Sequence, residues 1–481
     1  MSKIMLLMSK KVLLKENSEF IISPACIEIS GIHITKVKKH SLKSYQKYCE
    51  NENLHAIYEI HDFGDFLISP SFVNCHTHVA MSFFRAILNN RFKSKNLIED
   101  VLFKAESYLS PEDVQAFARM GAYENILNGN ALIWDHYYHA HSIANACLET
   151  GISAVIAPTL QDISGPGVHL CEKAFQDTIT IHEDNKFSKD AIFSSFGPHA
   201  TDTVSVDLWE RLRKEALSTN LPIHTHVAQS YEEVKRIYAK HKLTPIAFLK
   251  KLKILKSEIK SLLVHGIYLD KSDLNSINSK SSALVFCPFS QMIFQFPANI
   301  LDWEKHKLQW FIATDCVASN DSMNIQKELR FVSGFPSLHN TFQNYQKILK
   351  KSSLKERTIF LKNRKKTKLL EDKFSNSSFL LNKILSGPGN FHPKFKAGSI
   401  EINALANLTV WDIDHPSFWP PNNLQRSLSM GDTTGAIHNM CIKGKWVGKN
   451  GQFTHSILTS DKYKQSLKEA NERLTILLKK I

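Results

Sequence analysis

The 481-residue sequence lacks the marks of several large protein classes. It contains no apolar run of about 18 residues, the length that a membrane-spanning helix requires. The opening residues, MSKIMLLMSKKVLLKE, hold only a short apolar patch and no small-residue cleavage site, so we expect a first strand there and not a signal peptide. The sequence also has no RNP-type or zinc-finger pattern. These absences argue against a membrane protein and against the common nucleic-acid-binding modules.

Disulfide and metal-finger patterns of cysteine are absent as well. The chain has 8 cysteines, and none of them forms a Cys-x-x-Cys pair. Several lie inside apolar runs, as in LVFCP and IATDC. Separated, buried thiols are typical of a reducing compartment and not of a disulfide framework. We therefore predict a cytoplasmic protein.

Positive charge is in excess, with a formal net charge of +14. The lysines concentrate in residues 248–261 and 348–370. Apolar residues at helical spacing accompany the first cluster, as in an amphipathic surface helix. We interpret the lysines as a solvated face. A nucleic-acid surface is the less favoured alternative, which salt-dependent retention on nucleic acid would support.

The central part of the chain alternates short, continuously apolar runs with longer helical patterns. A run that is apolar throughout indicates a strand buried on both faces. Repeated β-then-α units predict an α/β fold, a (β/α)₈ barrel of the TIM type, over residues 70–397. The eight runs are 70–78, 130–138, 152–162, 191–199, 221–228, 261–266, 282–288 and 308–315.

The two ends of the chain read differently from the centre. Residues 1–69 and 398–455 contain short alternating strands and turns, and KNG (449–451) is a hairpin signal. We expect the two segments to pair into one small composite β-sandwich beside the barrel, followed by a C-terminal helix over 456–481. Residues 351–397, rich in lysine and serine, are interpreted as a surface excursion.

Histidines mark the ends of the predicted strands. His-x-His occurs three times, at 76/78, 139/141 and 224/226. The 139/141 pair begins the segment after the second strand, and we give it no metal role. Strand ends meet at one mouth of a (β/α)₈ barrel, where the catalytic groups of such barrels lie. The polar residues at these ends are His76, His78, His136, His199, His226, His265 and Asp315.

Four of these residues make a plausible mononuclear metal site. Two histidines at i and i+2 on a strand point to the same face. A third imidazole and a carboxylate complete a set that suits zinc, or Fe(II), with one position left for water. For a single histidine the ordinary reading is a hydrogen-bonded core residue, but so many polar groups at strand ends favour a site. The proposed ligands are His76, His78, His226 and Asp315.

The motifs resemble the amidohydrolase superfamily, and within it the branch of S-adenosylhomocysteine/methylthioadenosine deaminases and triazine hydrolases. The stretch SFVNCHTHVAMSFFR resembles the first-strand motif. NGNALIWDHYY, FGPHA, IHTHVAQS, LLVHG and IATDCVASNDSMN follow in the family's order, and KAGSIEINALANLTVWD resembles the closing sandwich strand. The resemblance implies a barrel with a β-sandwich, one divalent metal and hydrolysis of a heteroaromatic C–N bond in a small heterocycle.

The resemblance also implies roles for single residues. The four proposed ligands match the family's metal ligands, and Asp315 matches the carboxylate that takes a proton from the attacking water. His265 matches the histidine that orients the nucleophile. His199 matches a position that contacts substrate, and Glu106 matches another more loosely. His136, at the end of the second strand, joins the substrate side of the site.

One departure from the family's pattern matters most for the chemistry. The motif after the fifth strand normally reads His-x-x-Glu, whereas this chain has Gln229 three residues after His226. A glutamine can hydrogen-bond to a ring nitrogen but cannot transfer a proton to it. We therefore expect either that the leaving group needs little proton help or that another group supplies the proton, with His199 and His136 as the candidates. The alternative is a non-hydrolytic, metal-binding relative that serves as a binding or partner subunit. A homodimer is possible.

Overall fold

The fold is described from a computed structural model. It describes residues 4–50, 54–87, 96–293, 297–336, 353, 355–356, 358–359 and 372–481. The second lysine cluster, 348–370, lies largely outside these residues, as does the first part of the predicted excursion 351–397. The first lysine cluster contains only a short helix, because α10 (Pro245–Lys251) ends within it.

Two parallel sheets form the centre of the molecule. One has the order β10-β8-β7-β6, with β9 beside β8, and the other has the order β11-β12-β13-β14. Bridges between Phe196 and Ile223 and between Thr77 and Asp315 join the sheets on both sides and close the barrel. The strands are β6 (Phe72–Thr77), β7 (Asn130–Tyr137), β8 (Ser153–Leu160), β9 (Ile192–Ser194), β10 (Gly197–Pro198), β11 (Ile223–Val227), β12 (Ser261–His265), β13 (Ser282–Phe286) and β14 (Trp310–Ile312).

The barrel strands follow the predicted apolar runs, so the predicted fold class is confirmed. Almost every residue in them is buried, as expected for strands covered on both faces. The fourth run is divided between β9 and β10, on either side of Ser195 and Phe196. The strands run next to one another in chain order around the barrel. Their carboxyl ends therefore meet at one mouth.

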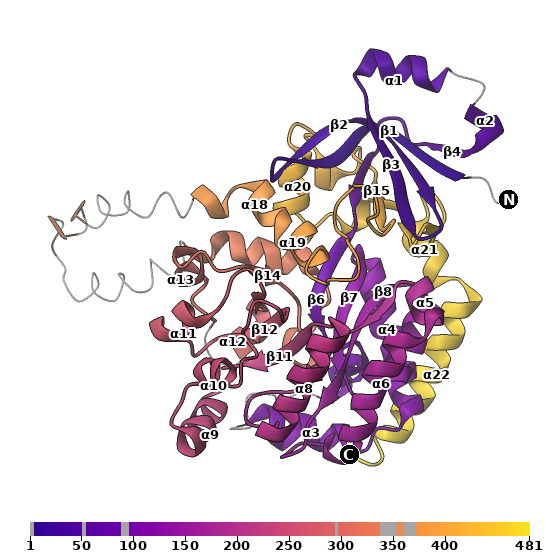
Figure 1. Ribbon diagram of the computed structural model, residues 1–481. Coiled ribbons are helices and arrows are strands. Elements are labelled where there is room, and N and C mark those ends of the chain that lie inside the picture. The colour runs from indigo at the N-terminus through magenta and orange to yellow at the C-terminus, as the bar shows by residue number, and fades with distance from the viewer. Residues whose placement is uncertain are drawn as a thin grey trace.

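Helices surround the strands (Figure 1). The helix α4 begins with a capping box in which Ser110 and Asp113 bond each other's backbone N–H, and Pro111 occupies the first turn. These helices are α3 (Phe103–Glu106), α4 (Pro111–Leu127), α5 (Ala140–Thr150), α6 (Cys171–Glu183), α7 (Asn185–Lys189), α8 (Val206–Thr219), α9 (Tyr231–His241), α10, α11 (Lys271–Ser276), α12 (Pro288–Ile293), α13 (Ile300–Lys305) and α14 (Val317–Asn320). The 3₁₀ helix Val79–Ala86 follows β6 directly.

Strands from both chain ends form a second, smaller β unit (Figure 1). The antiparallel pairing of β5 with β15 joins the N-terminal strands to the C-terminal ones. Apolar side chains from both ends, including Leu7, Ile27 and Val410, make one core on this sheet. Its strands are β1 (Ile4–Glu16), β2 (Glu19–Ser30), β3 (His33–Lys39), β4 (Tyr58–Asp62), β5 (Leu67–Pro70), β15 (Leu408–Trp411), β16 (Ile437–Ile442) and β17 (Lys445–Trp446).

The prediction of a hairpin turn at KNG (449–451) is wrong. The turn between β16 and β17 is made by Lys443 and Gly444, whose φ angles of 55° and 69° suit a two-residue hairpin turn. Asn450 and Gly451 instead form a turn that leads into α21 (Phe453–Leu458). Two turn signals lie close together here, and only the first is flanked by residues that pair.

The chain ends in α22 (Asp461–Leu477), which lies along the barrel beside α4 (Figure 1). Arg473 is 3.2 Å from Asp113 in α4, and Arg119 in α4 pairs with Glu469. The remaining helices near the small sheet are α1 (Leu42–Cys49), α2 (Leu54–Ile57), α18 (Ser377–Asn382), α19 (Ser386–Gly389) and α20 (Leu424–Met430). The unit borders at residues 69, 398 and 455 stay a prediction.

Two further expectations concern the chain as a whole. Among the described residues, no helix combines the length and apolar character that crossing a membrane would need. All of the cysteines are free thiols, and six of the eight are buried. The cysteines are thus separated thiols, most of them inside the core.

Candidate active site

The first barrel strand and the end of the last one meet at the candidate site. His76 and His78 lie at the end of β6, two residues apart, and therefore point to the same side. The backbone N–H of Asp315, just after β14, donates to the carbonyl of His76 at 3.1 Å. The hydrogen bond that closes the barrel thus brings the Asp315 carboxylate beside both histidines.

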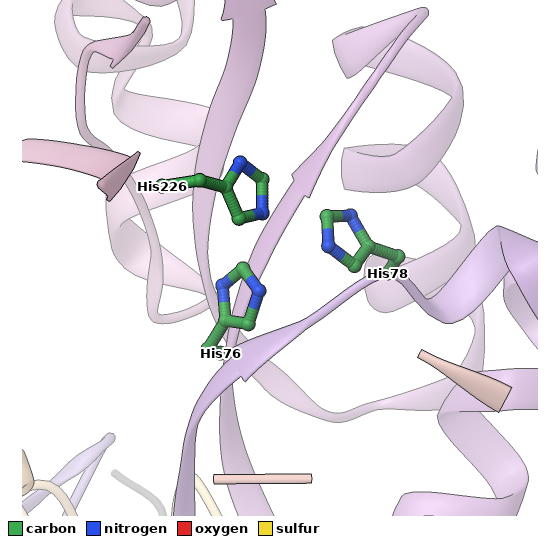
Figure 2. A group of neighbouring side chains, drawn as sticks. All are labelled: His76, His78 and His226. Carbon is green, nitrogen blue, oxygen red and sulfur yellow. The ribbon is translucent and has the colours of Figure 1, made fainter. Parts of the chain in front are cut away.

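A third histidine reaches the same point from β11. The backbone N–H of His226 donates to the carbonyl of His199 at 3.1 Å, which fixes β11 next to the fourth strand position. Figure 2 shows the rings of His76, His78 and His226 turned toward a common centre. Residues separated by about one third of the chain therefore meet because all the parallel strands of the closed barrel end at the same mouth.

The distances within this cluster suit a small cation. One ring nitrogen from each of His76, His78 and His226 lies within 4.8 Å of the others. The Asp315 Oδ1 atom is 3.4 Å from His76 Nε2 and 3.3 Å from His78 Nε2. His265, at the end of β12, forms a second candidate ligand group with His76 and Asp315. Two overlapping ligand sets are therefore possible.

Hydrogen bonds hold the ligand-type side chains from behind. His226 Nδ1 bonds the carbonyl of His199 at 2.8 Å, and His78 Nδ1 bonds the carbonyl of His136. Both contacts leave Nε2 available for a metal. His76 Nε2 is buried and has no hydrogen-bond partner among the described residues. A divalent cation would satisfy it, so the donor set fits the metal that the sequence implied.

The Asp315 carboxylate is held by two further groups. Ser290 donates its hydroxyl to Oδ2 at 2.5 Å, and the backbone N–H of Cys316 donates to Oδ1 at 2.7 Å. Asp315 itself has a φ of 63°, and His265 has a φ of 78°. Left-handed backbone at non-glycine residues is costly and persists where the surroundings enforce it, which is common at functional sites.

Burial sets the charge state of the cluster. It lowers the pKa of His76 to about 4 and that of His226 well below its ordinary value. The imidazoles of His76 and His226 are thus kept neutral, the form that binds metals. Burial also lowers the pKa of His78, but the contact with Asp315 outweighs it and raises that pKa above its ordinary value. Burial alone would raise the pKa of Asp315, but the nearby imidazoles of His76 and His78 hold that pKa well below its usual range. The carboxylate is ionised and ready to act as a ligand or proton acceptor.

A cleft opens over the cluster. Gln229 lines the cleft, together with the predicted substrate-side residues Glu106, His136 and His199. His265 is fully buried and is not among the lining residues. Apolar and aromatic side chains make the remaining walls: Met81, Ile98, Leu102, Phe103, Tyr137, Tyr138 and Cys316.

Glu106 is a buried carboxylic acid of the cleft with a raised pKa. Its side chain ends α3 and is only 8% exposed. Burial raises its pKa to about 7, against smaller opposing effects of Tyr137 and His78. The two histidines that were expected to supply a proton behave differently. Burial lowers the pKa of His199 to about 3 and that of His136 well below 6.5.

Several residues of the site were not singled out from the sequence. Ser290 and Ser319 form a hydroxyl pair at 2.7 Å behind Asp315. Glu233 accepts the backbone N–H groups of Ala228 and Gln229 at 3.0 and 2.9 Å, and so fixes the loop that carries Gln229. Neither serines nor a helix-start glutamate carry a sequence signal for such roles. His224, by contrast, belongs to a visible His-x-His pair.

Sequence relatives point to one enzyme family. The model of the amidohydrolase family matches residues 67–346. A 5-methylthioadenosine/S-adenosylhomocysteine deaminase of Clostridium tetani is 24% identical over 422 residues, covering 87% of this chain and 88% of the relative. A 5'-deoxyadenosine deaminase of Methanopyrus kandleri is 23% identical over 388 residues, covering 80% and 82%. The predicted resemblance is thereby confirmed.

Solved structures share the fold over nearly their whole length. An adenosine deaminase from Xanthomonas campestris with bound zinc has a TM-score of 0.78 at 17% identity, covering 99% of each chain. A triazine hydrolase from Arthrobacter aurescens has a TM-score of 0.77 at 15% identity, covering 98% of this chain and 100% of the other. The family model covers more than half of the sequence, and the chain belongs to the amidohydrolase family.

Proposed function

We propose that this protein is a metal-dependent hydrolase that cleaves a C–N bond of a heteroaromatic ring, a hydrolytic deaminase of a purine-, pterin- or triazine-like compound. The observation that carries the proposal is the convergence of three histidines and one aspartate beneath a cleft. The matched relatives are deaminases of adenosine derivatives, which supports an amino-substituted ring as substrate.

The metal is one divalent ion, zinc before iron, held by His76, His78, His226 and Asp315. Three neutral nitrogens and one carboxylate suit zinc with a position left open. Two solved neighbours contain zinc, which supports that choice. When bound, such an ion supplies Lewis-acid chemistry and lowers the pKa of a water molecule towards neutrality.

The chain's own residues then move the protons. Asp315, ionised at neutral pH, accepts a proton from the attacking water. His265 Nε2 lies 3.8 Å from Asp315 Oδ2 and orients the nucleophile and the tetrahedral oxygen. The new bond joins the water oxygen to the ring carbon. The C–N bond then breaks, and the amino group leaves as ammonia with the proton that Asp315 took from the water.

Glu106 is the better candidate for protonating the ring nitrogen. Gln229 can hydrogen-bond to the ring edge, but its amide N–H is too weak an acid to transfer a proton. A carboxyl with a pKa of about 7 is partly protonated at neutral pH, whereas the buried His199 and His136 are neutral and hold no spare proton. An acid with a pKa near the working pH is the efficient one.

The walls of the cleft suit a flat ring. Aromatic faces come from Phe103, Tyr137 and Tyr138, while polar groups at His199 and Gln229 can read the ring edge. Stacking supplies affinity, and a few placed hydrogen bonds supply orientation. A cytoplasmic location belongs to the same proposal and is supported by the scattered, buried thiols. A homodimer stays a prediction.

A substrate screen tests the function. The zinc-loaded protein is incubated with purines, nucleosides, pterins and triazines, and ring absorbance is followed together with ammonia release. We expect turnover of at least one amino-substituted ring, and loss of that turnover in Asp315→Asn. A metal-loaded, folded protein that turns over none of these classes would support the alternative, a relative that binds metal without hydrolysis.

A further inference from the structure

His224 lies directly behind the proposed metal ligand His76. It precedes His226 by two residues on β11, so both side chains point to the barrel interior. The two rings are fully buried or nearly so, and His224 Nε2 is 2.8 Å from His76 Nδ1. Such a short contact between two imidazoles requires that one nitrogen donates and the other accepts.

The direction of this hydrogen bond follows from the proposed metal site. When Nε2 of His76 binds a metal, its neutral ring carries the proton on Nδ1. His76 therefore donates to His224 Nε2, and the proton of His224 lies on its own Nδ1. His78 and His226 use backbone carbonyls for the same purpose, whereas His76 uses a side chain. This contact can therefore be removed by substitution.

We propose that His224 is a positioning residue for the metal, resting on the function proposed above. Its Nε2 accepts the Nδ1–H of His76, which fixes the tautomer and the ring orientation of that ligand. A purely structural histidine would be replaceable by any ring of similar size. His224 packs edge-on against Trp134 and His136, at centroid distances of 5.9 and 5.4 Å. A phenyl ring retains the aromatic character of this packing but cannot accept the hydrogen bond.

The zinc affinity of three variants tests this role, measured by competition with a chelator. Loss of such an outer contact typically weakens metal binding about 10–100-fold. We expect this loss in His224→Phe and a substantial recovery in His224→Gln, whose amide oxygen can accept from His76. The visible spectrum of the cobalt-loaded protein should change in His224→Phe, because the orientation of one ligand changes.

His392→Phe is the matched control. His392 is equally buried and also contacts Trp134, at 5.7 Å between ring centroids, but its Nε2 bonds the carbonyl of Ser194 and not a ligand. The zinc affinity of the His392→Phe variant should equal that of wild type. The inference is overturned if His224→Phe, folded by circular dichroism, binds zinc as wild type does, or if His224→Gln is no better than His224→Phe. A wild type that binds no zinc overturns the proposed function itself.

Discussion

At the scale of single residues, Gln229 stands where the sequence resemblance predicts a glutamate. It lines the cleft, and Glu233 fixes its backbone N–H. Losing a well-placed general acid typically costs about 10²–10⁴-fold in rate. The departure therefore matters only if no other group gives the proton, and Glu106 lines the same cleft.

Substitution of Gln229 should separate binding from proton transfer. Gln229→Ala should lower kcat/KM while the metal stays bound, because a hydrogen bond to the ring is lost. Gln229→Glu should raise the rate on amino-substituted rings and add a dependence on an acidic group. Gln176→Ala, on the exposed side of α6, is the control and should change nothing. If Gln229→Ala matches wild type and Gln229→Glu gains nothing, Gln229 has no role in the reaction.

The raised pKa of Glu106 predicts a pH dependence. The protonated carboxyl is the active form, so kcat/KM should fall as the pH rises through about 7. Glu106→Gln should lower kcat/KM by about 10²-fold or more and remove that fall. The exposed Glu112 offers a control, since Glu112→Gln should keep the wild-type profile. An unchanged alkaline fall in Glu106→Gln would assign it to another group.

His265→Ala decides between the two possible ligand sets. If His265 only orients the nucleophile, the variant keeps one metal per chain and loses turnover by about 10²-fold or more. Metal content and rate are measured on the same preparation. His265 is fully buried, so His265→Gln is measured as well, because it leaves a smaller cavity than alanine does. Loss of the metal together with activity would instead make His265 a ligand, with His76 and Asp315 as its partners.

At the scale of elements, the close approach of α4 to the 3₁₀ helix after β6 positions the end of the ligand strand. A Cβ atom at Gly121 would lie 2.2 Å from the carbonyl oxygen of Val79, which follows His78. Gly121→Ala should therefore force the two helices apart and cost about 1–3 kcal/mol of stability. The measurement is the free energy of unfolding in denaturant, together with zinc affinity.

Gly334→Ala is the control for that substitution. Gly334 is also helical, is exposed, and has no heavy atom within 4 Å of an added Cβ. It should be neutral or stabilise the protein by about 0.4–1 kcal/mol, because alanine restricts the unfolded chain. Equal effects of the two substitutions would mean that the contact between α4 and Val79 is not tight.

The strands and the candidate ligands could be predicted because their signals are local. Continuous apolar runs mark buried parallel strands, and His76, His226 and Asp315 stand where those runs stop. The partner of His224 could not be predicted, because its role depends on which ring lies opposite across the barrel. The position of the β16–β17 turn was predicted wrongly for a related reason. Both KG (443–444) and KNG (449–451) are suitable turn sequences, and only the pairing of the flanking strands selects the first.

At the scale of the whole molecule, the two chain ends are tied into one unit. Leu408 pairs with Pro70 and Trp411 pairs with Leu67, so the strand that leads into the barrel is held by the strand that follows it. The α22 helix then returns to α4 through ion pairs. This arrangement keeps the site at the far mouth of the barrel, on rigid strand ends.

The metal content of the purified protein tests the central claim most directly. The protein is loaded with zinc or iron, freed of excess ion and measured by elemental analysis, beside His226→Ala as the ligand-deficient control. We predict one tightly held divalent ion per chain in wild type and a strong loss in His226→Ala. A folded wild-type protein that stays metal-free after loading would contradict the site and the hydrolytic function built on it.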